Sequence, residues 1–251
     1  MHKYIYPSKL LLSITLFLIL TTFACNKNDS PHSGECNCTS PVDTLYLSDA
    51  YQLIFKEIYT DPEHEDRDNP YFDEQKVAEI LNAIQAVYNL DIPERDEVFF
   101  EHQIHAFPFM GLHSISLKTD TTASEVQKLI AGEPTGNQEL DNIIAKYKFN
   151  EVRTSLYYPE FNWITIISEE SLNLFPVINE LKAFPFFEYV EFGGGAIGDG
   201  NNITLERFEN YMKLDFSIGW GDCPSGCIYR KHWIFSVDQK CNAAFLNSFT
   251  D

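Results

Sequence analysis

Basic residues are scarce in this chain of 251 residues. Lysine and arginine together number 18, whereas aspartate and glutamate number 37, so the formal net charge at pH 7 is −19. A surface with this charge repels nucleic acids and anionic membranes, because net charge acts on solubility and on the choice of partners. The composition therefore argues against nucleic acid as a partner. It leaves cationic ligands, metal ions and basic peptides open.

The chain also lacks the short motifs that indicate common chemistries. It contains no Gly-x-Ser-x-Gly elbow, no His-Glu-x-x-His motif and no Cys-x-x-Cys pair, and no Lys-Ser/Thr follows its glycine-rich segment 193–202. A serine hydrolase, a zinc protease, a thioredoxin-like enzyme and a phosphate-binding loop each need one of these spacings. We therefore predict a protein without catalytic residues and without an obligatory cofactor.

Long apolar runs are missing except near the start of the chain. Residues 10–23 are almost wholly apolar, follow Lys3 and Lys9, and end at Ala24. A membrane-spanning helix needs about 20 apolar residues, and this run is shorter. A basic start, a short apolar run and a small residue at its end are typical of a secretory signal. We expect residues 1–24 to be a signal peptide, and an uncleaved membrane anchor is the alternative.

The next residues indicate a lipid anchor. Residues 22–25 (TFAC) resemble the lipobox of bacterial lipoproteins. The usual lipobox has leucine where this chain has Thr22, and a small residue where this chain has Phe23. Residues 25–29 (CNKND) resemble the acidic export tag of Bacteroidetes lipoproteins, which tolerate such departures. The resemblance implies acylation of Cys25 and attachment to the outer membrane of the cell envelope, facing either the periplasm or the cell surface. Several acyl chains hold a protein stably on a membrane.

Six cysteines in an exported chain suggest disulfide bonds. With one cysteine acylated, five remain. Cys223 and Cys227 lie in one short loop and form the best pair. Cys241 could join Cys36 or Cys38 and connect the N-terminal linker to the C-terminus, which leaves one thiol over.

Composition and periodicity divide the rest of the chain into a tether and three structured regions. Residues 25–42 are polar and contain proline, serine and glycine, as flexible tethers do. Apolar residues at helical spacing predict helices within 43–110, on both sides of an acidic loop at 61–68. Near the end of this region, residues 97–105 have the composition of a strand.

Strands and helices alternate within residues 111–192. The patterns predict strands at 113–118, 151–156, 163–167 and 187–192, and helices at 125–130, 140–147 and 174–183. The order βαββαβ, with its first helix broken, is that of a ferredoxin-like split βαβ unit. Its last helix and strand resemble the propeptide modules of subtilisin-type proteases, which implies a protease inhibitor as one functional alternative.

The C-terminal region, residues 193–251, has the clearest strand signal. Apolar and polar residues alternate over 212–220, a turn follows, and a second strand is expected at 228–238. We predict an antiparallel hairpin that continues the ferredoxin-like sheet and has a disulfide between Cys223 and Cys227 at its tip. The whole fold is then α+β, with N-terminal helices, a split βαβ sheet and this hairpin.

The turn sequence carries a family resemblance. Residues 219–227 (GWGDCPSGC), together with 228–233 (IYRKHW) and 198–202 (GDGNN), resemble a family of uncharacterised Bacteroidetes lipoproteins. The likeness extends to residues 104–108 (IHAFP) and 136–141 (GNQELD), and so over most of the mature chain. That family carries no established activity, so the resemblance implies a location and not a function.

The hairpin tip is our candidate binding surface, because rigid loops that carry an aromatic side chain and charges serve recognition. We assign Trp220, Asp222, Arg230, Lys231 and His232 to this surface. The partner would be an unknown protein or small molecule.

The sequence offers two candidate metal sites. Asp199 and Asn201 could supply oxygen ligands to Ca²⁺, which takes six to eight of them, although a turn built on glycine and asparagine explains the same residues. His102, His105 and His113 are the candidates for zinc. Residues 102 and 105 of a strand would point to opposite faces, so we expect no shared zinc site there.

Together these features predict a membrane-anchored envelope lipoprotein that binds a ligand and is not an enzyme. The alternatives are a disulfide-redox or hydrolytic enzyme of the envelope and a protease inhibitor. Cys223 and Cys227 are separated by three residues and do not open a helix whose N-terminus would stabilise a thiolate. This spacing favours a structural bridge over redox work.

Overall fold

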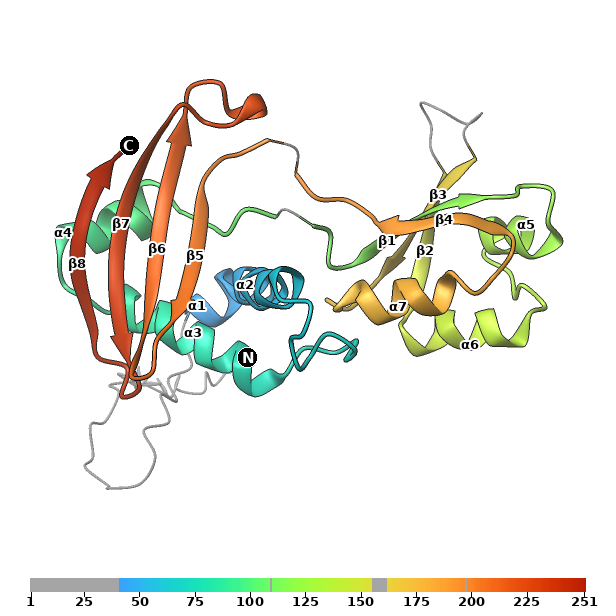
Figure 1. The fold of residues 1–251 in the computed structure, drawn as a ribbon, viewed down its shortest axis with the longest axis horizontal. Helices are drawn as coiled ribbons and strands as arrows, with labels where there is room; N and C mark the ends of the chain where they lie inside the picture. The colour runs from blue at the N-terminus through green and yellow to red at the C-terminus, as the bar shows by residue number, and fades with distance from the viewer. Residues whose placement is uncertain (1–40, 109, 155–161, 197) are drawn as a thin grey trace, which may run out of the picture. The chain divides into compact units, whose positions relative to one another are not determined.

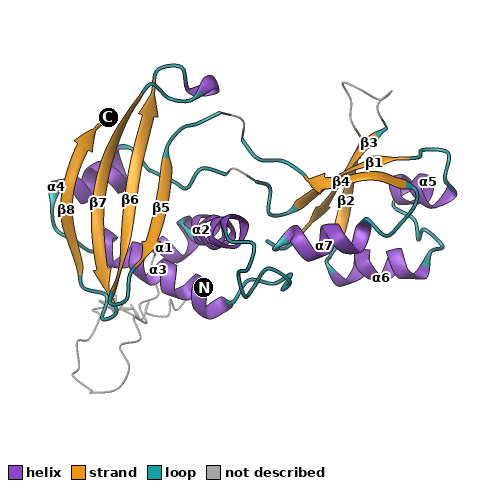
Figure 2. Ribbon diagram, in the orientation of Figure 1, coloured by secondary structure: helices purple, strands orange, loops and turns teal. Residues whose placement is uncertain are grey.

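The computed structural model describes residues 41–108, 110–154, 162–196 and 198–251. The chain divides into two compact units, residues 1–33 and 34–251, and every described residue belongs to the second unit. The expected signal peptide, the acylated Cys25, and Cys36 and Cys38 lie outside the described residues. The fold is α+β, with helices at the N-terminal side and two four-stranded antiparallel sheets (Figures 1 and 2), and the predicted class is confirmed.

Helices fill the N-terminal part of the described chain, as predicted. They are α1 Pro41–Leu45, α2 Leu47–Thr60, α3 Glu74–Tyr88 and α4 Pro93–Asp96. Helix α3 begins where the side chain of Asp73 accepts hydrogen bonds from the backbone N–H groups of Gln75 and Lys76, which satisfies two donors that a helix start leaves free. None of the helices in the described ranges has the length and apolar character that crossing a membrane requires.

The strand predicted at 97–105 is wrong, because a π-helix occupies Glu97–Glu101. Val98 and Phe99 follow each other and are both buried, whereas a strand would turn neighbouring side chains to opposite faces. The indole N–H of Trp233 donates a hydrogen bond to the Glu97 carboxylate over 3.0 Å. Contacts with the C-terminal sheet therefore outweigh the local preference of this sequence for a strand.

The middle of the chain forms the predicted split βαβ unit. Its elements are β1 Ser114–Thr119, α5 Ser124–Ala131, α6 Gln138–Lys146, β2 Phe149–Thr154, β3 Trp163–Ser168, α7 Leu174–Leu181 and β4 Phe187–Phe192. The strand order is β2-β3-β1-β4, and every neighbouring pair is antiparallel. This order is that of a ferredoxin-like sheet, so the prediction is confirmed.

The C-terminal hairpin forms, but it belongs to a larger, separate sheet. Strands β5 Asn202–Arg207, β6 Tyr211–Trp220, β7 Tyr229–Asp238 and β8 Ala243–Thr250 pair in this order. The prediction that the hairpin continues the ferredoxin-like sheet is therefore wrong. Strands β6 and β7 form the predicted hairpin, and a disulfide joins Cys223 to Cys227 at its tip.

Helices α1–α3 and the sheet β5–β8 share one hydrophobic core. The sheet contributes alternate residues, among them Leu214, Phe216, Trp233 and Phe235, and helix α3 contributes Ile80. The two ends of the described chain thus build one core, and a second core fills the ferredoxin-like region between them in sequence. Because neighbouring residues of a strand face opposite sides, the other face of the sheet β5–β8 carries its polar side chains.

Candidate binding surface at the hairpin tip

The hairpin tip is a tight connection between β6 and β7. Trp220 and Tyr229 are the last register pair, and the backbone N–H of Ile228 donates to the Trp220 carbonyl over 3.0 Å. Between them a short 3-10 turn covers Cys223–Ser225. Gly221 has a φ of +100°, a backbone conformation that L side chains rarely adopt. The last register pair, the Ile228–Trp220 hydrogen bond and the 3-10 turn therefore hold the backbone of the tip in one conformation.

The disulfide lies directly on the sheet because residue 219 is glycine. A Cβ atom at Gly219 would overlap the Cys227 Sγ and lie 2.8 Å from the Cys227 Cβ. The close approach of the disulfide thus explains why the first residue of the Gly-Trp-Gly segment is glycine. The bridge and the strand pack without a gap for a side chain.

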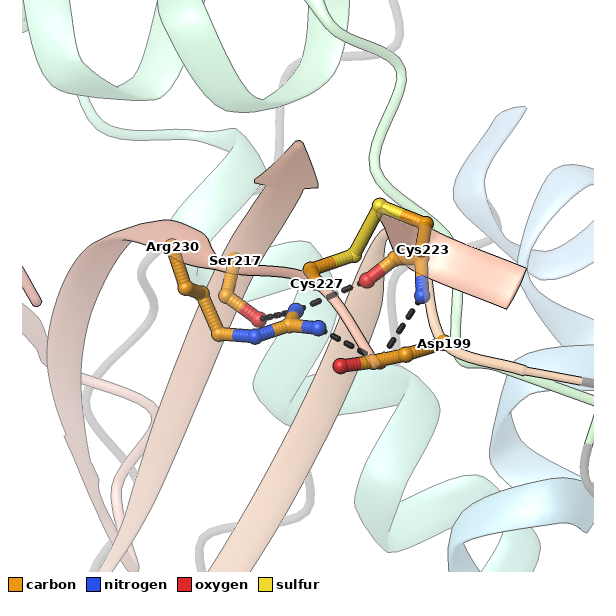
Figure 3. Close-up of a disulfide and its surroundings, with 6 residues drawn as sticks. Asp199, Ser217, Cys223, Cys227 and Arg230 are labelled. Carbon is orange, nitrogen blue, oxygen red and sulfur yellow. Dashed lines mark hydrogen bonds and ion pairs between the residues drawn. A yellow bond between two sulfur atoms is a disulfide. The ribbon is translucent and has the colours of Figure 1, made fainter. Parts of the chain in front are cut away.

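A partly buried ion pair connects the tip to the loop before β5. The Arg230 guanidinium lies 2.5 Å from the Asp199 carboxylate, and donates to the Gly200 carbonyl over 2.7 Å and to Ser217 Oγ over 2.9 Å. Figure 3 shows Arg230 between Ser217 and Asp199, beside the disulfide. The backbone N–H of Asp199 also donates to the Cys223 carbonyl over 2.8 Å. These contacts hold the tip at a defined position on the loop.

The electrostatics of Asp199 reflect this contact. Burial acts to raise the pKa of its carboxyl, but the hydrogen bonds from Arg230 and from the Gly200 backbone outweigh burial and lower the pKa below its ordinary value. The carboxylate predicted as a calcium ligand is therefore the partner of a guanidinium, and Asn201 is exposed on the same loop. Within the described ranges no three His, Cys, Asp or Glu side chains gather to hold a metal ion. Calcium binding stays a prediction.

The apolar side chains at the tip face solvent. Trp220 is 42% exposed, Tyr229 51% and Ile228 61%. The rings of Trp220 and Tyr229 stack, with centroids 5.8 Å apart and planes 27° apart. Asp222 is exposed beside them. Our sequence analysis did not assign Ile228 and Tyr229 to this surface, because it placed both within the second strand of the hairpin. Their position directly after the turn was the available signal.

The three other residues predicted at the tip have structural contacts instead. Arg230 forms the ion pair described above. Lys231 Nζ lies 2.6 Å from the Glu97 carboxylate and 4.3 Å from the centroid of the Trp233 ring. Of the five predicted residues, Trp220 and Asp222 are the two whose side chains are exposed.

His232 is the third of these residues, and its ring is largely buried. Its Nδ1 lies 2.9 Å from an Asp215 oxygen, and the ring stacks on Phe249 with centroids 4.6 Å apart. Burial raises the pKa of the Asp215 carboxyl, and the hydrogen bond with His232 partly offsets that effect. Ser217 stands opposite His232 in the register, but its hydroxyl is engaged by Arg230. These contacts order the polar face of the sheet.

The three histidines considered for zinc have separate partners. His105 Nδ1 lies 2.9 Å from the buried Asp49 carboxylate, and His113 Nε2 lies 3.1 Å from Ser171 Oγ. The ring of His102 lies 5.5 Å from the ring of Trp233. The structure does not bring these histidines together.

The remaining cysteine among the described residues, Cys241, is disulfide-bonded. Cys36 and Cys38, the two predicted partners of Cys241, both lie outside the described ranges.

Comparison with protein-family models, with curated proteins and with solved structures finds no match. The candidate surface therefore rests on its own geometry.

Proposed function

We propose that this protein is a lipid-anchored protein of the cell envelope that binds a partner protein through its hairpin tip. The observation that carries the proposal is the exposed apolar group formed by Trp220, Ile228 and Tyr229 on a backbone that a disulfide fixes. Large aromatic side chains dominate the binding energy of protein interfaces. A surface that is already ordered loses little entropy on binding.

The charges around the tip define the partner more closely. Arg230 and Lys231 are neutralised by Asp199 and Glu97, so the exposed charged group among the predicted tip residues is Asp222. A chain with a net charge of −19 attracts basic surfaces. The partner therefore presents an apolar pocket with a basic rim.

A pull-down from envelope extracts tests the tip. The full-length protein and the double variant Trp220→Ala, Tyr229→Ala serve as baits, with Tyr189→Ala as the control because Tyr189 is 62% exposed on β4. We expect a partner that the wild type and the control retain and the double variant loses. An unchanged partner profile of the double variant would contradict the proposal.

The anchor is tested on its own. Its support is the resemblance of residues 22–25 to a lipobox and the short apolar run before them. We expect mass spectrometry of the native product to find acyl chains on an N-terminal Cys25, and Cys25→Ser to move the protein out of the membrane fraction. An unprocessed leader or an unacylated cysteine would contradict the anchor and leave the tip untouched.

A further inference from the structure

A concave site lies at the end of the sheet β5–β8 that is opposite to the hairpin tip. A cavity of about 720 Å³ is lined by helix α3 and by the turns that join β5 to β6 and β7 to β8. Pockets of roughly 300 to 1,000 Å³ hold small molecules. The cavity is therefore large enough for an organic ligand.

Two aromatic side chains form one wall of this cavity. Phe208 and Tyr211 stack almost in parallel, with ring centroids 4.5 Å apart and planes 7° apart, and both are exposed. The backbone N–H of Phe208 donates to the Tyr211 carbonyl over 2.9 Å, which closes the turn that carries both rings. The π-faces of such rings attract cations.

The cavity is lined by more acidic than basic side chains. Among the described residues that line the cavity, three carboxylates, Glu79, Glu209 and Asp238, accompany one guanidinium, Arg207. Arg207 is already balanced, since it lies 2.7 Å from Glu57 and 2.8 Å from Glu79. Glu209 and Asp238 therefore leave the cavity with an excess of negative charge.

The ionisation of Asp238 supports the excess of negative charge in the cavity. Hydrogen bonds from the Asn242 side chain and from the backbone of Asn242 and Lys240 lower the pKa of the Asp238 carboxyl, so the carboxyl is ionised at neutral pH. Lys240 is exposed in the same turn and partly offsets the charge of Asp238. The Glu209 side chain is exposed on the β5–β6 turn.

We propose that this cavity binds a small organic cation, an ammonium group that carries methyl or methylene substituents. The rings of Phe208 and Tyr211 supply the faces for the cation, Glu209 supplies the opposite charge, and Gln75 and Asn82 on α3 can form hydrogen bonds with a polar group of the ligand. The proposal is independent of the function proposed for the hairpin tip.

Calorimetric titration of the full-length protein with choline tests the site. The comparison compound is 3,3-dimethylbutan-1-ol, which has the shape of choline without its charge. Titration at 0.15 M salt screens attraction between exposed charges beyond about 8 Å. We expect one choline per chain, bound at least about tenfold more tightly than the alcohol. Equal affinity of the two compounds, or no saturable binding of choline, would overturn the proposal.

Variants separate the cavity from general attraction to an acidic protein. We expect Tyr211→Leu and Glu209→Gln each to weaken choline binding at least about fivefold, whereas Tyr189→Leu, at an exposed tyrosine of β4, binds as the wild type does. Thermal unfolding shows whether each variant is folded. If Tyr211→Leu does not fold, Glu209→Gln decides, because its side chain is exposed in a turn. Wild-type affinity of the deciding variant would overturn the proposal.

Discussion

At the scale of single residues, a buried carboxylate organises the start of the described chain. Asp49 on α2 is buried, lies 2.9 Å from His105 Nδ1, and also accepts a hydrogen bond from the backbone N–H of Ala106. The His105 ring stacks on Tyr46 with centroids 4.6 Å apart. The hydrogen bond with Asp49 raises the pKa of His105 because it favours the protonated ring, and burial acts in the opposite direction.

This contact makes part of the stability depend on pH. Because the pKa of His105 is higher in the folded than in the unfolded protein, its contribution is fully present below the unfolded value of about 6.5. The contribution is lost as the pH rises through the folded pKa. We expect the difference in the free energy of unfolding between the wild type and His105→Gln, measured by urea titration, to be larger at pH 6 than at pH 9. The same difference at both pH values would contradict this assignment.

A second prediction at this scale concerns Gly219. A methyl group there would overlap the Cys227 sulfur, so we expect Gly219→Ala to cost about 1–3 kcal/mol of stability, the usual range for overpacking. Gly200→Ala is the matched control, because its Cβ would meet only Phe107 at 3.6 Å, an ordinary contact. Equal midpoints of chemical denaturation for the two variants would contradict the prediction that a side chain at position 219 destabilises the packing of the disulfide on the strand.

At the scale of elements, the hairpin tip is held by covalent and polar contacts together. The Cys223–Cys227 bridge closes a loop of sequence separation 4. Cross-linking removes freedom from the unfolded chain, and for so short a loop the chain-entropy relation gives about 2 kcal/mol. The Asp199–Arg230 ion pair remains when the bridge is removed, so the rest of the sheet should keep its fold.

We therefore expect the double variant Cys223→Ser, Cys227→Ser to stay folded and to lose about 2 kcal/mol in the free energy of unfolding. Chemical denaturation without reductant measures this loss. The wild type in reductant is a less selective comparison, because Cys241 is disulfide-bonded as well. Loss of the cooperative transition in the double variant would mean that the bridge is required for folding.

Elements with their own periodicity could be predicted, and elements defined by distant contacts could not. The βαββαβ region and the β6–β7 hairpin have patterns that set each strand and helix within a few residues. Strand β8 is exposed over most of its length, so its position depends on pairing with β7 and not on an alternating pattern. The π-helix at Glu97–Glu101 depends in the same way on its contact with Trp233.

The same distinction applies to the candidate surface. Trp220 and Asp222 could be found from the turn sequence alone. The contact between Asp199 and Arg230 joins residues 31 positions apart, and nothing in the local sequence of either residue indicates it. Polar and charged residues near the turn were therefore interpreted as exposed, although Arg230, Lys231 and His232 each have a carboxylate partner.

At the scale of the whole molecule, we propose that excess negative charge and a small apolar group at the tip govern the choice of binding partner. The net charge of −19 discourages association with acidic surfaces. Trp220, Ile228 and Tyr229 interrupt that polar surface at one end of the sheet β5–β8. A lipid anchor would keep this surface at the envelope, where a basic and apolar partner can reach it.

Photo-crosslinking in cells tests the central claim, that the hairpin tip is a protein-recognition surface, most directly. A photoreactive amino acid replaces Ile228 at the tip, and in a second strain it replaces Tyr189; the two side chains are 61% and 62% exposed. We predict a discrete crosslinked species from position 228 that is absent from position 189. The same pattern from both positions, or no crosslink from position 228, would contradict the account.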